Sequence, residues 1–164
     1  MAKAYLICGS TGAGKSTFAK KLSEEFEAQV YSIDEWMKGL FWSDSPKTEV
    51  FSWALERVKR CEDLILTLAQ RQLVRSQSVV LDLGFTTRQQ RQRVFEKLQG
   101  SGHVFELIYL EVPAEVRRQR VQYRNLNRGE TFAFEVSEQM FDFVETLFEA
   151  PTAEELVNGK IIRN

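Results

Sequence analysis

The sequence contains one glycine-rich octapeptide, Gly9-Ser10-Thr11-Gly12-Ala13-Gly14-Lys15-Ser16, which matches the pattern G-x-x-x-x-G-K-[S/T] at every defined position. Glycines let backbone N–H groups turn inward around phosphate oxygens, in conformations that a side chain would block. The apolar run 4–8 predicts a buried strand before the loop, and residues 15–26 predict a helix after it, whose positive dipole end favours an anion. This strand, loop and helix favour a phosphate-binding loop over a plain glycine-rich turn that caps a helix.

The side chains of the loop predict how it binds a nucleotide. Lys15 would reach the outer phosphates of ATP and assist catalysis there, and the Ser16 hydroxyl would bind Mg²⁺. Thr17 is a further candidate for nucleotide contact, although a place in the helix explains it better. ATP and Mg²⁺ are therefore the expected cofactors, and residues 9–17 are the expected binding segment.

Strand and helix patterns alternate along the rest of the chain. We expect strands at 30–33, 79–81, 104–110 and 160–163, and helices at 49–75, 88–98, from 113 onward and at 137–148. This alternation predicts right-handed βαβ units in a three-layer α/β P-loop fold around a five-stranded parallel sheet. Residues 1–164 should form one domain. The phosphate loop should lie mid-sheet, because we expect the neighbours of the first strand to come later in the chain.

Composition excludes several classes of protein. The 164 residues include 22 Lys or Arg and 23 Asp or Glu, whereas a domain that binds duplex nucleic acid through its phosphates is expected to be basic. Two cysteines, Cys8 and Cys61, cannot form a disulfide framework. No apolar stretch approaches the roughly 18 residues of a membrane span. We therefore expect a cytoplasmic protein without nucleic-acid or membrane partners.

The charges are unevenly distributed along the chain. Residues 71–128 are rich in Lys and Arg, and residues 130–155 contain acids and no base. Solvated helix faces of opposite sign explain this pattern, and Arg117 and Arg118 are assigned to such a face. A basic segment that faces an anionic ligand is the alternative.

Missing motifs narrow the class of P-loop protein. The sequence has no N-K-x-D motif, which guanine-specific switches use. Leu83 follows Asp82 at the position where motor ATPases usually place a catalytic Glu, and the chain has no room for their helical lid domain. The small kinases remain, in which ATP phosphorylates a second substrate.

Several motifs resemble one family. They are the phosphate loop, Ser32-Ile33-Asp34, Arg120-x-x-x-Arg124, and Phe148-Glu149-Ala150-Pro151 followed by Glu154-Glu155. Over nearly the whole chain they resemble the small P-loop kinases of the AAA-type ATP-binding "predicted kinase" family. That family is related to zeta toxin, polynucleotide 5′-kinase, chloramphenicol phosphotransferase and gluconate kinase. The resemblance implies an ATP-dependent phosphotransferase.

Asp34 is the candidate general base. It would end a strand at the carboxyl edge of the sheet, where ligands of open α/β sheets bind. A carboxylate there can accept the proton of a hydroxyl that attacks the γ-phosphate, and the resemblance implies the same role. A helix N-cap is the alternative role, and Glu35 is the rival carboxylate. Polynucleotide and toxin relatives tend to carry Arg where this chain has Met37, which argues against a nucleic-acid 5′ end as acceptor.

Two further groups complete the expected site. Asp82 ends the third strand and would join the Mg²⁺ shell or orient the acceptor hydroxyl, with a turn residue as the alternative. The resemblance implies that Arg120 and Arg124 lie in a small lid at about 118–133. There Arg120 would bind ATP, and Arg124 would neutralise charge on the γ-phosphoryl group.

The expected activity is transfer of the γ-phosphate of ATP to a hydroxyl of a small molecule. A nucleoside, nucleotide or polynucleotide 5′-hydroxyl kinase is the first alternative. An ATP-binding regulatory module with little transfer activity is the second, and it would depend on Lys15 and Ser16 but not on Asp34. The sequence does not name the acceptor, because acceptor pockets vary on a shared scaffold.

Overall fold

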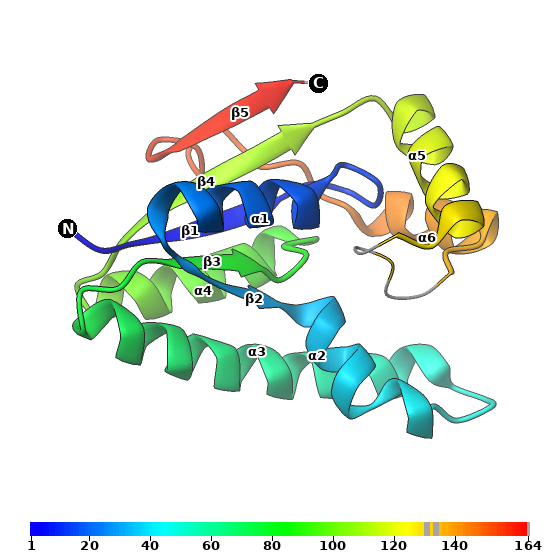
Figure 1. Cartoon of the computed structure of the whole chain (residues 1–164), viewed down its shortest axis with the longest axis horizontal. Coiled ribbons are helices and arrows are strands. Elements are labelled where there is room, and N and C mark those ends of the chain that lie inside the picture. Colours follow the sequence, from blue (N-terminus) through cyan, green and yellow to red (C-terminus); the bar gives the residue numbers. More distant parts are fainter. Residues whose placement is uncertain (130–131, 133–134, 164) are drawn as a thin grey trace.

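The computed structural model describes residues 1–129, 132 and 135–163. Within these ranges, five strands form one sheet, and helices pack on both of its faces (Figure 1). The elements are β1 (Lys3–Cys8), α1 (Lys15–Phe26), β2 (Gln29–Ser32), α2 (Ile33–Leu40), η1 (Trp42–Asp44), α3 (Val50–Val74), β3 (Val79–Asp82), α4 (Arg88–Gly100), β4 (Val104–Glu111), α5 (Ala114–Asn127), α6 (Glu138–Leu147) and β5 (Gly159–Arg163). None of the described helices combines the length and the apolar composition that a membrane span needs.

All neighbouring strands run parallel, in the order β2-β3-β1-β4-β5. Leu6 of β1 aligns with Leu81 of β3 on one side and with Leu107 of β4 on the other. Both neighbours of β1 come later in the chain, as predicted. The phosphate loop therefore leaves the middle of the sheet, at the edge where the carboxyl ends of the strands meet and where α5 and α6 lie (Figure 1).

Different helices bury the two faces of the sheet, because side chains alternate along each strand. In β1, Ala4, Leu6 and Cys8 pack in the core cluster that contains residues of α3 and α4. Tyr5 and Ile7 pack in the cluster that contains residues of α1. Figure 1 shows α1 on one side of the strands and α3 and α4 on the other. The predicted three-layer P-loop fold is confirmed.

The basic and acidic segments of the sequence pair with one another. Arg117 Nη2 lies 2.6 Å from Glu145 Oε2, and Arg91 Nε lies 2.6 Å from Glu155 Oε1. Both arginines are buried. The prediction that Arg117 belongs to a solvated helix face is therefore wrong. The physical reason is that a buried guanidinium needs charged and polar partners, and the acidic segment supplies them.

Candidate active site

The phosphate loop adopts a conformation that favours glycine at two positions. Gly12 and Gly14 have φ angles of +81° and +91°, which residues with side chains rarely adopt. A Cβ atom on Gly12 would also lie only 2.6 Å from the carbonyl oxygen of Arg117. The loop therefore packs directly on the backbone of α5, and Gly12 permits that approach.

The first residues of α1 place a cation and a hydroxyl beside the loop. Lys15 Nζ donates a hydrogen bond to the carbonyl oxygen of Ser10, at 3.3 Å, and Ser16 Oγ donates one to Asp82 Oδ2, at 2.8 Å. Asp82 ends β3, as predicted, and is 5% exposed. Burial raises the pKa of Asp82, whereas Lys15 and the Ser16 hydrogen bond oppose this rise.

The oxygens of Ser16 and Asp82 fit Mg²⁺. A carboxylate and a hydroxyl are hard oxygen ligands, and Mg²⁺ usually completes its shell with substrate phosphates and water. Burial disfavours the ionised form of Asp82, and the negative charges of Asp34 and Glu35 disfavour it further. A divalent cation at this position would offset both effects. Ser16 and Asp82 are therefore the residues that would hold the ion.

A cavity of about 950 Å³ lies beside the phosphate loop. It brings together most of the predicted site residues, namely Gly9, Ser10, Thr11, Gly12, Gly14, Lys15, Ser16, Thr17, Asp34, Asp82, Arg120 and Arg124. The side chain of Ala13 differs from these, because it is buried in the core cluster beneath α1. The residues predicted from the sequence thus line one cavity, although they belong to four different elements and to the loop.

Asp34 lies on a helix rather than at the end of a strand. β2 ends at Ser32, whose side-chain oxygen accepts a hydrogen bond from the N–H of Glu35 at 3.3 Å and caps α2. The prediction that Asp34 ends a strand is therefore wrong, and so is the alternative that it caps the helix, because Ser32 takes both positions. Asp34 is exposed in the first turn of α2 and lines the cavity. Lys38, one turn further along α2, lines it as well.

Arg120 and Arg124 both line the cavity from α5. Arg120 Nη1 lies 4.0 Å from the position that a Cβ atom on Gly14 would take. Arg124 Nε is buried and has no hydrogen-bond partner within the described part of the chain. A buried donor of this kind is costly unless a ligand oxygen satisfies it. Of the segment expected as a lid, positions 130, 131 and 133 lie outside the described residues.

Sequence reasoning missed Arg117 and Glu145, which lie behind the loop. Arg117 donates hydrogen bonds to Glu145 and to the carbonyl oxygen of Thr11, and Ser10 Oγ donates one to Glu145. The sequence did offer a signal, because positions 117, 120 and 124 recur at helical spacing and share one face of α5.

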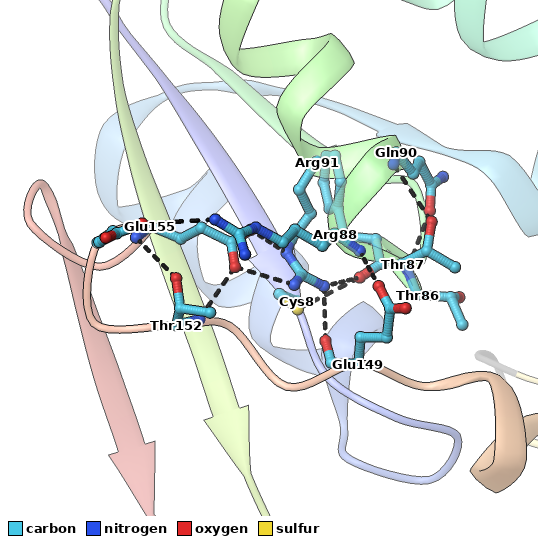
Figure 2. Close-up of polar contacts among 11 residues, drawn as sticks. Cys8, Thr86, Thr87, Arg88, Gln90, Arg91, Glu149, Thr152 and Glu155 are labelled. Carbon is cyan, nitrogen blue, oxygen red and sulfur yellow. Dashed lines mark hydrogen bonds and ion pairs between the residues drawn. The ribbon is translucent and has the colours of Figure 1, made fainter.

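Arg91, a third missed residue, fixes the segment that follows α6 (Figure 2). Its side chain is fully buried, and it donates to both carboxylate oxygens of Glu155 at 2.6 and 3.1 Å. Arg91 Nη1 also donates to the carbonyl oxygens of Phe85 at 3.0 Å and of Glu149 at 2.7 Å. These bonds hold residues 149–155 against the turn after β3, where Thr86 lines the cavity.

The family comparison agrees with the motifs. A family model described as AAA domain matches residues 5–151. The chain therefore belongs to this AAA domain family, which confirms the resemblance to AAA-type P-loop proteins. No curated protein sequence matches the chain.

Solved structures share the fold at low sequence identity. A protein from Chloroflexus aurantiacus J-10-fl, proposed to be a kinase, matches with a TM-score of 0.75 and 15% identity, over 99% of this chain and 88% of that chain. Kti12 from Chaetomium thermophilum, solved with ADP-AlF3, matches with a TM-score of 0.72 and 13% identity, over 98% and 88% of the two chains. A gluconokinase from Sinorhizobium meliloti 1021 matches with a TM-score of 0.61 and 15% identity, over 98% and 82%. At these identities the matches establish the fold.

Proposed function

We propose that the chain is an Mg²⁺·ATP-dependent kinase that transfers the γ-phosphate of ATP to a hydroxyl group of a small molecule. One observation carries the proposal: the cavity beside the phosphate loop is also lined by Ser16 and Asp82, by Asp34, and by Arg120 and Arg124. Each of these groups has a separate task in phosphoryl transfer. The AAA domain family and the kinase neighbours support the same activity.

The reaction exchanges one P–O bond for another. The acceptor oxygen bonds to the γ-phosphorus while the bond from that phosphorus to the β,γ-bridging oxygen breaks, and ADP leaves. Asp34 accepts the proton that the acceptor hydroxyl loses. Lys15 and Arg124 neutralise the negative charge that spreads over the γ-phosphoryl oxygens.

The nucleotide is held at the phosphate loop. Backbone N–H groups of the loop and of the first turn of α1 bind the phosphates, and Arg120 contacts them from α5. Ser16 and Asp82 would hold Mg²⁺, which would supply positive charge that offsets the charge of the phosphates.

A small acceptor suits the site better than a nucleic-acid end. The net charge of the chain is −1. Met37 stands where polynucleotide and toxin relatives tend to carry Arg, and it is 2% exposed and packs in the core. It is therefore not available to contact a substrate phosphate. A kinase for the 5′-hydroxyl of nucleosides, nucleotides or polynucleotides is the first alternative, and an ATP-binding regulatory module is the second.

The test is transfer of labelled γ-phosphate from ATP across a panel of sugars, nucleosides, antibiotics and oligonucleotides. The Lys15→Ala variant is the control, which should lose useful ATP binding and transfer without unfolding, because the Lys15 side chain adds nothing to the core. Transfer by the wild type to a small hydroxyl compound supports the proposal. Transfer to nucleosides or oligonucleotides alone would select the first alternative, and ATP binding without transfer to any member would select the regulatory module.

A further inference from the structure

A partly buried ion pair contacts the phosphate loop. Arg117 on α5 and Glu145 on α6 share two hydrogen bonds of 2.6 Å, from Nη1 to Oε1 and from Nη2 to Oε2. Arg117 is 6% exposed. Neither side chain is among the described residues that line the cavity. The pair is therefore placed to act on the loop and not on the nucleotide itself.

The ion pair is bonded to two consecutive residues of the loop. Arg117 Nη1 also donates to the carbonyl oxygen of Thr11, at 3.2 Å, and Ser10 Oγ donates to Glu145 Oε1. Arg117 Nε donates to the carbonyl oxygen of Val112, at 2.9 Å, directly after β4. One guanidinium thus joins the loop, the end of β4 and α6.

Gly12 of the loop also packs closely against α5, the helix that carries Arg120 and Arg124. A Cβ atom on Gly12 would lie 2.6 Å from the carbonyl oxygen of Arg117 and 3.0 Å from Val121 Cγ2. Arg120 and Arg124 occur on the next turns of the same helix face and reach the cavity. A shift of the first turn of α5 would therefore move both guanidinium groups relative to the loop.

We propose that Arg117 and Glu145 form a positioning pair, which presets the phosphate loop and α5 for the nucleotide without touching it. The inference rests on the part of the proposed function that assigns the nucleotide to this loop. Preset N–H and guanidinium donors bind an anion without first having to be ordered, so a loosened loop binds it more weakly. The hydrogen bond from Arg117 holds the pKa of Glu145 below its usual value although partial burial opposes this, so the carboxylate stays ionised at neutral pH.

The experiment measures the affinity of the full chain for a non-hydrolysable ATP analogue with Mg²⁺, by calorimetry. Arg117→Lys keeps the charge but loses the planar fork, and Glu145→Gln keeps the shape but loses the charge. Each should weaken binding about tenfold or more, because hydrogen bonds to charged groups contribute energies of this order. Asp142→Asn is the matched control, since Asp142 pairs with Arg118 at 2.8 Å between the same two helices and is 63% exposed. It should bind the analogue as the wild type does.

A double-mutant cycle separates a loop effect from a folding effect. Thermal unfolding of each variant shows that it is folded at the temperature of the binding assay. Ser10→Ala removes only the hydroxyl that reaches Glu145, so it leaves the ion pair in place and folds even where Arg117→Lys does not. The double variant of Ser10→Ala and Glu145→Gln should lose less affinity than the two single variants lose in sum. The reason is that both substitutions alter the same contact, the hydrogen bond from Ser10 to Glu145.

The outcomes are distinct. Unchanged affinity in Glu145→Gln and Arg117→Lys would overturn the positioning role. Tighter binding by Glu145→Gln would overturn it as well, because only the removal of a negative charge near the anion would then matter. Equal losses in Asp142→Asn would reduce the effect to a general loosening of α5 on α6. Failure of the wild type to bind the analogue would instead contradict the proposed function, and the inference with it.

Discussion

Ser16 Oγ donates a hydrogen bond of 2.8 Å to Asp82 Oδ2, which joins the start of α1 to the end of β3. The two residues meet because β3 pairs with β1, so the end of β3 and the loop that follows β1 share one edge of the sheet. Asp82 is 5% exposed, and burial raises its pKa. An ionised carboxylate in that position opposes folding, which is characteristic of a group retained for its function.

Asp82→Asn should therefore stabilise the fold and weaken nucleotide binding. The folded-state pKa of Asp82 lies above the unfolded value, so its ionisation at neutral pH disfavours the folded state. Asn does not ionise, and its oxygen can still accept the Ser16 hydrogen bond. The melting temperature at neutral pH should rise by a few degrees, since about 1 kcal/mol shifts Tm by roughly 2–4 °C at this chain length.

The gain in Tm from Asp82→Asn should shrink as the pH falls through the folded-state pKa of Asp82, and it should be lost below the ordinary Asp value of 3.8, where the wild-type carboxyl is protonated in both states. Calorimetry should show weaker binding of the ATP analogue in the presence of Mg²⁺. A variant that is less stable at neutral pH, or that binds the Mg²⁺ complex as tightly as the wild type, would contradict the assignment of Asp82.

Arg124→Lys should reduce phosphoryl transfer more than it reduces ATP affinity. The variant keeps the positive charge but loses the planar fork, which is the geometry that suits the γ-phosphoryl oxygens in the transition state. We expect a loss of transfer of about tenfold or more, with a smaller change in binding. Arg128→Lys is the control, because Arg128 is exposed and pairs with Glu135 at 3.7 Å. Equal losses of transfer and affinity would make Arg124 a nucleotide-binding residue only.

Hydrogen exchange tests whether the end of α5 orders on the nucleotide. Arg120 and Arg124 carry like charges on one helix face, and bound phosphates would neutralise them. Amides of residues 121–129 should gain protection when the ATP analogue and Mg²⁺ are added. Equal protection with and without ligand would show that no such ordering takes place.

Glu155→Gln should destabilise the fold and reduce its sensitivity to acid. Burial of Glu155 opposes its ionisation, but hydrogen bonds from Arg91 and from the N–H of Thr152 outweigh it, so the pKa of Glu155 is lowered. Because the folded-state pKa lies below the unfolded value, this stabilisation is present above the ordinary Glu value of 4.5 and is lost as the pH falls through the folded-state pKa. Removal of one partner from a buried ion pair costs about 3 kcal/mol or more.

Urea unfolding from neutral to acid pH measures the effect of Glu155→Gln. Glu154→Gln is the matched control, since Glu154 lies 3.4 Å from Arg88 and is 87% exposed. The control should unfold as the wild type does, because exposed pairs contribute little. If the two variants have the same stability at neutral pH, the buried contact between Arg91 and Glu155 does not stabilise the protein.

The parts of the fold that depend on local sequence could be predicted. The phosphate loop requires glycine at the positive φ angles of Gly12 and Gly14, so its pattern is readable from eight residues. The sheet followed from the alternation of strands with helices. Asp34 was misplaced at the end of a strand because Ser32 is both the last residue of β2 and the cap of α2, a boundary that local preferences do not resolve.

The ion pairs of the two buried arginines could not be predicted from local pattern. Arg117 and Glu145 are 28 residues apart, and Arg91 and Glu155 are 64 residues apart. Sheet order and helix packing bring each pair together, and neither is encoded in the neighbouring residues. On sequence alone these arginines look like ordinary solvated charges, and only the fold shows that they are buried.

Parallel assays of ATP-analogue binding and of γ-phosphate transfer, on Asp34→Asn and on Glu35→Gln, decide whether Asp34 is the general base of a kinase. The acceptor is the one that the wild type phosphorylates in the panel. Asp34→Asn should bind the analogue as the wild type does and transfer phosphate about 10²-fold more slowly or worse, because the amide cannot take the proton of the acceptor hydroxyl. Glu35→Gln should retain near-wild-type transfer. Near-wild-type transfer by Asp34→Asn, or a greater loss in Glu35→Gln, would show that Asp34 is not the base.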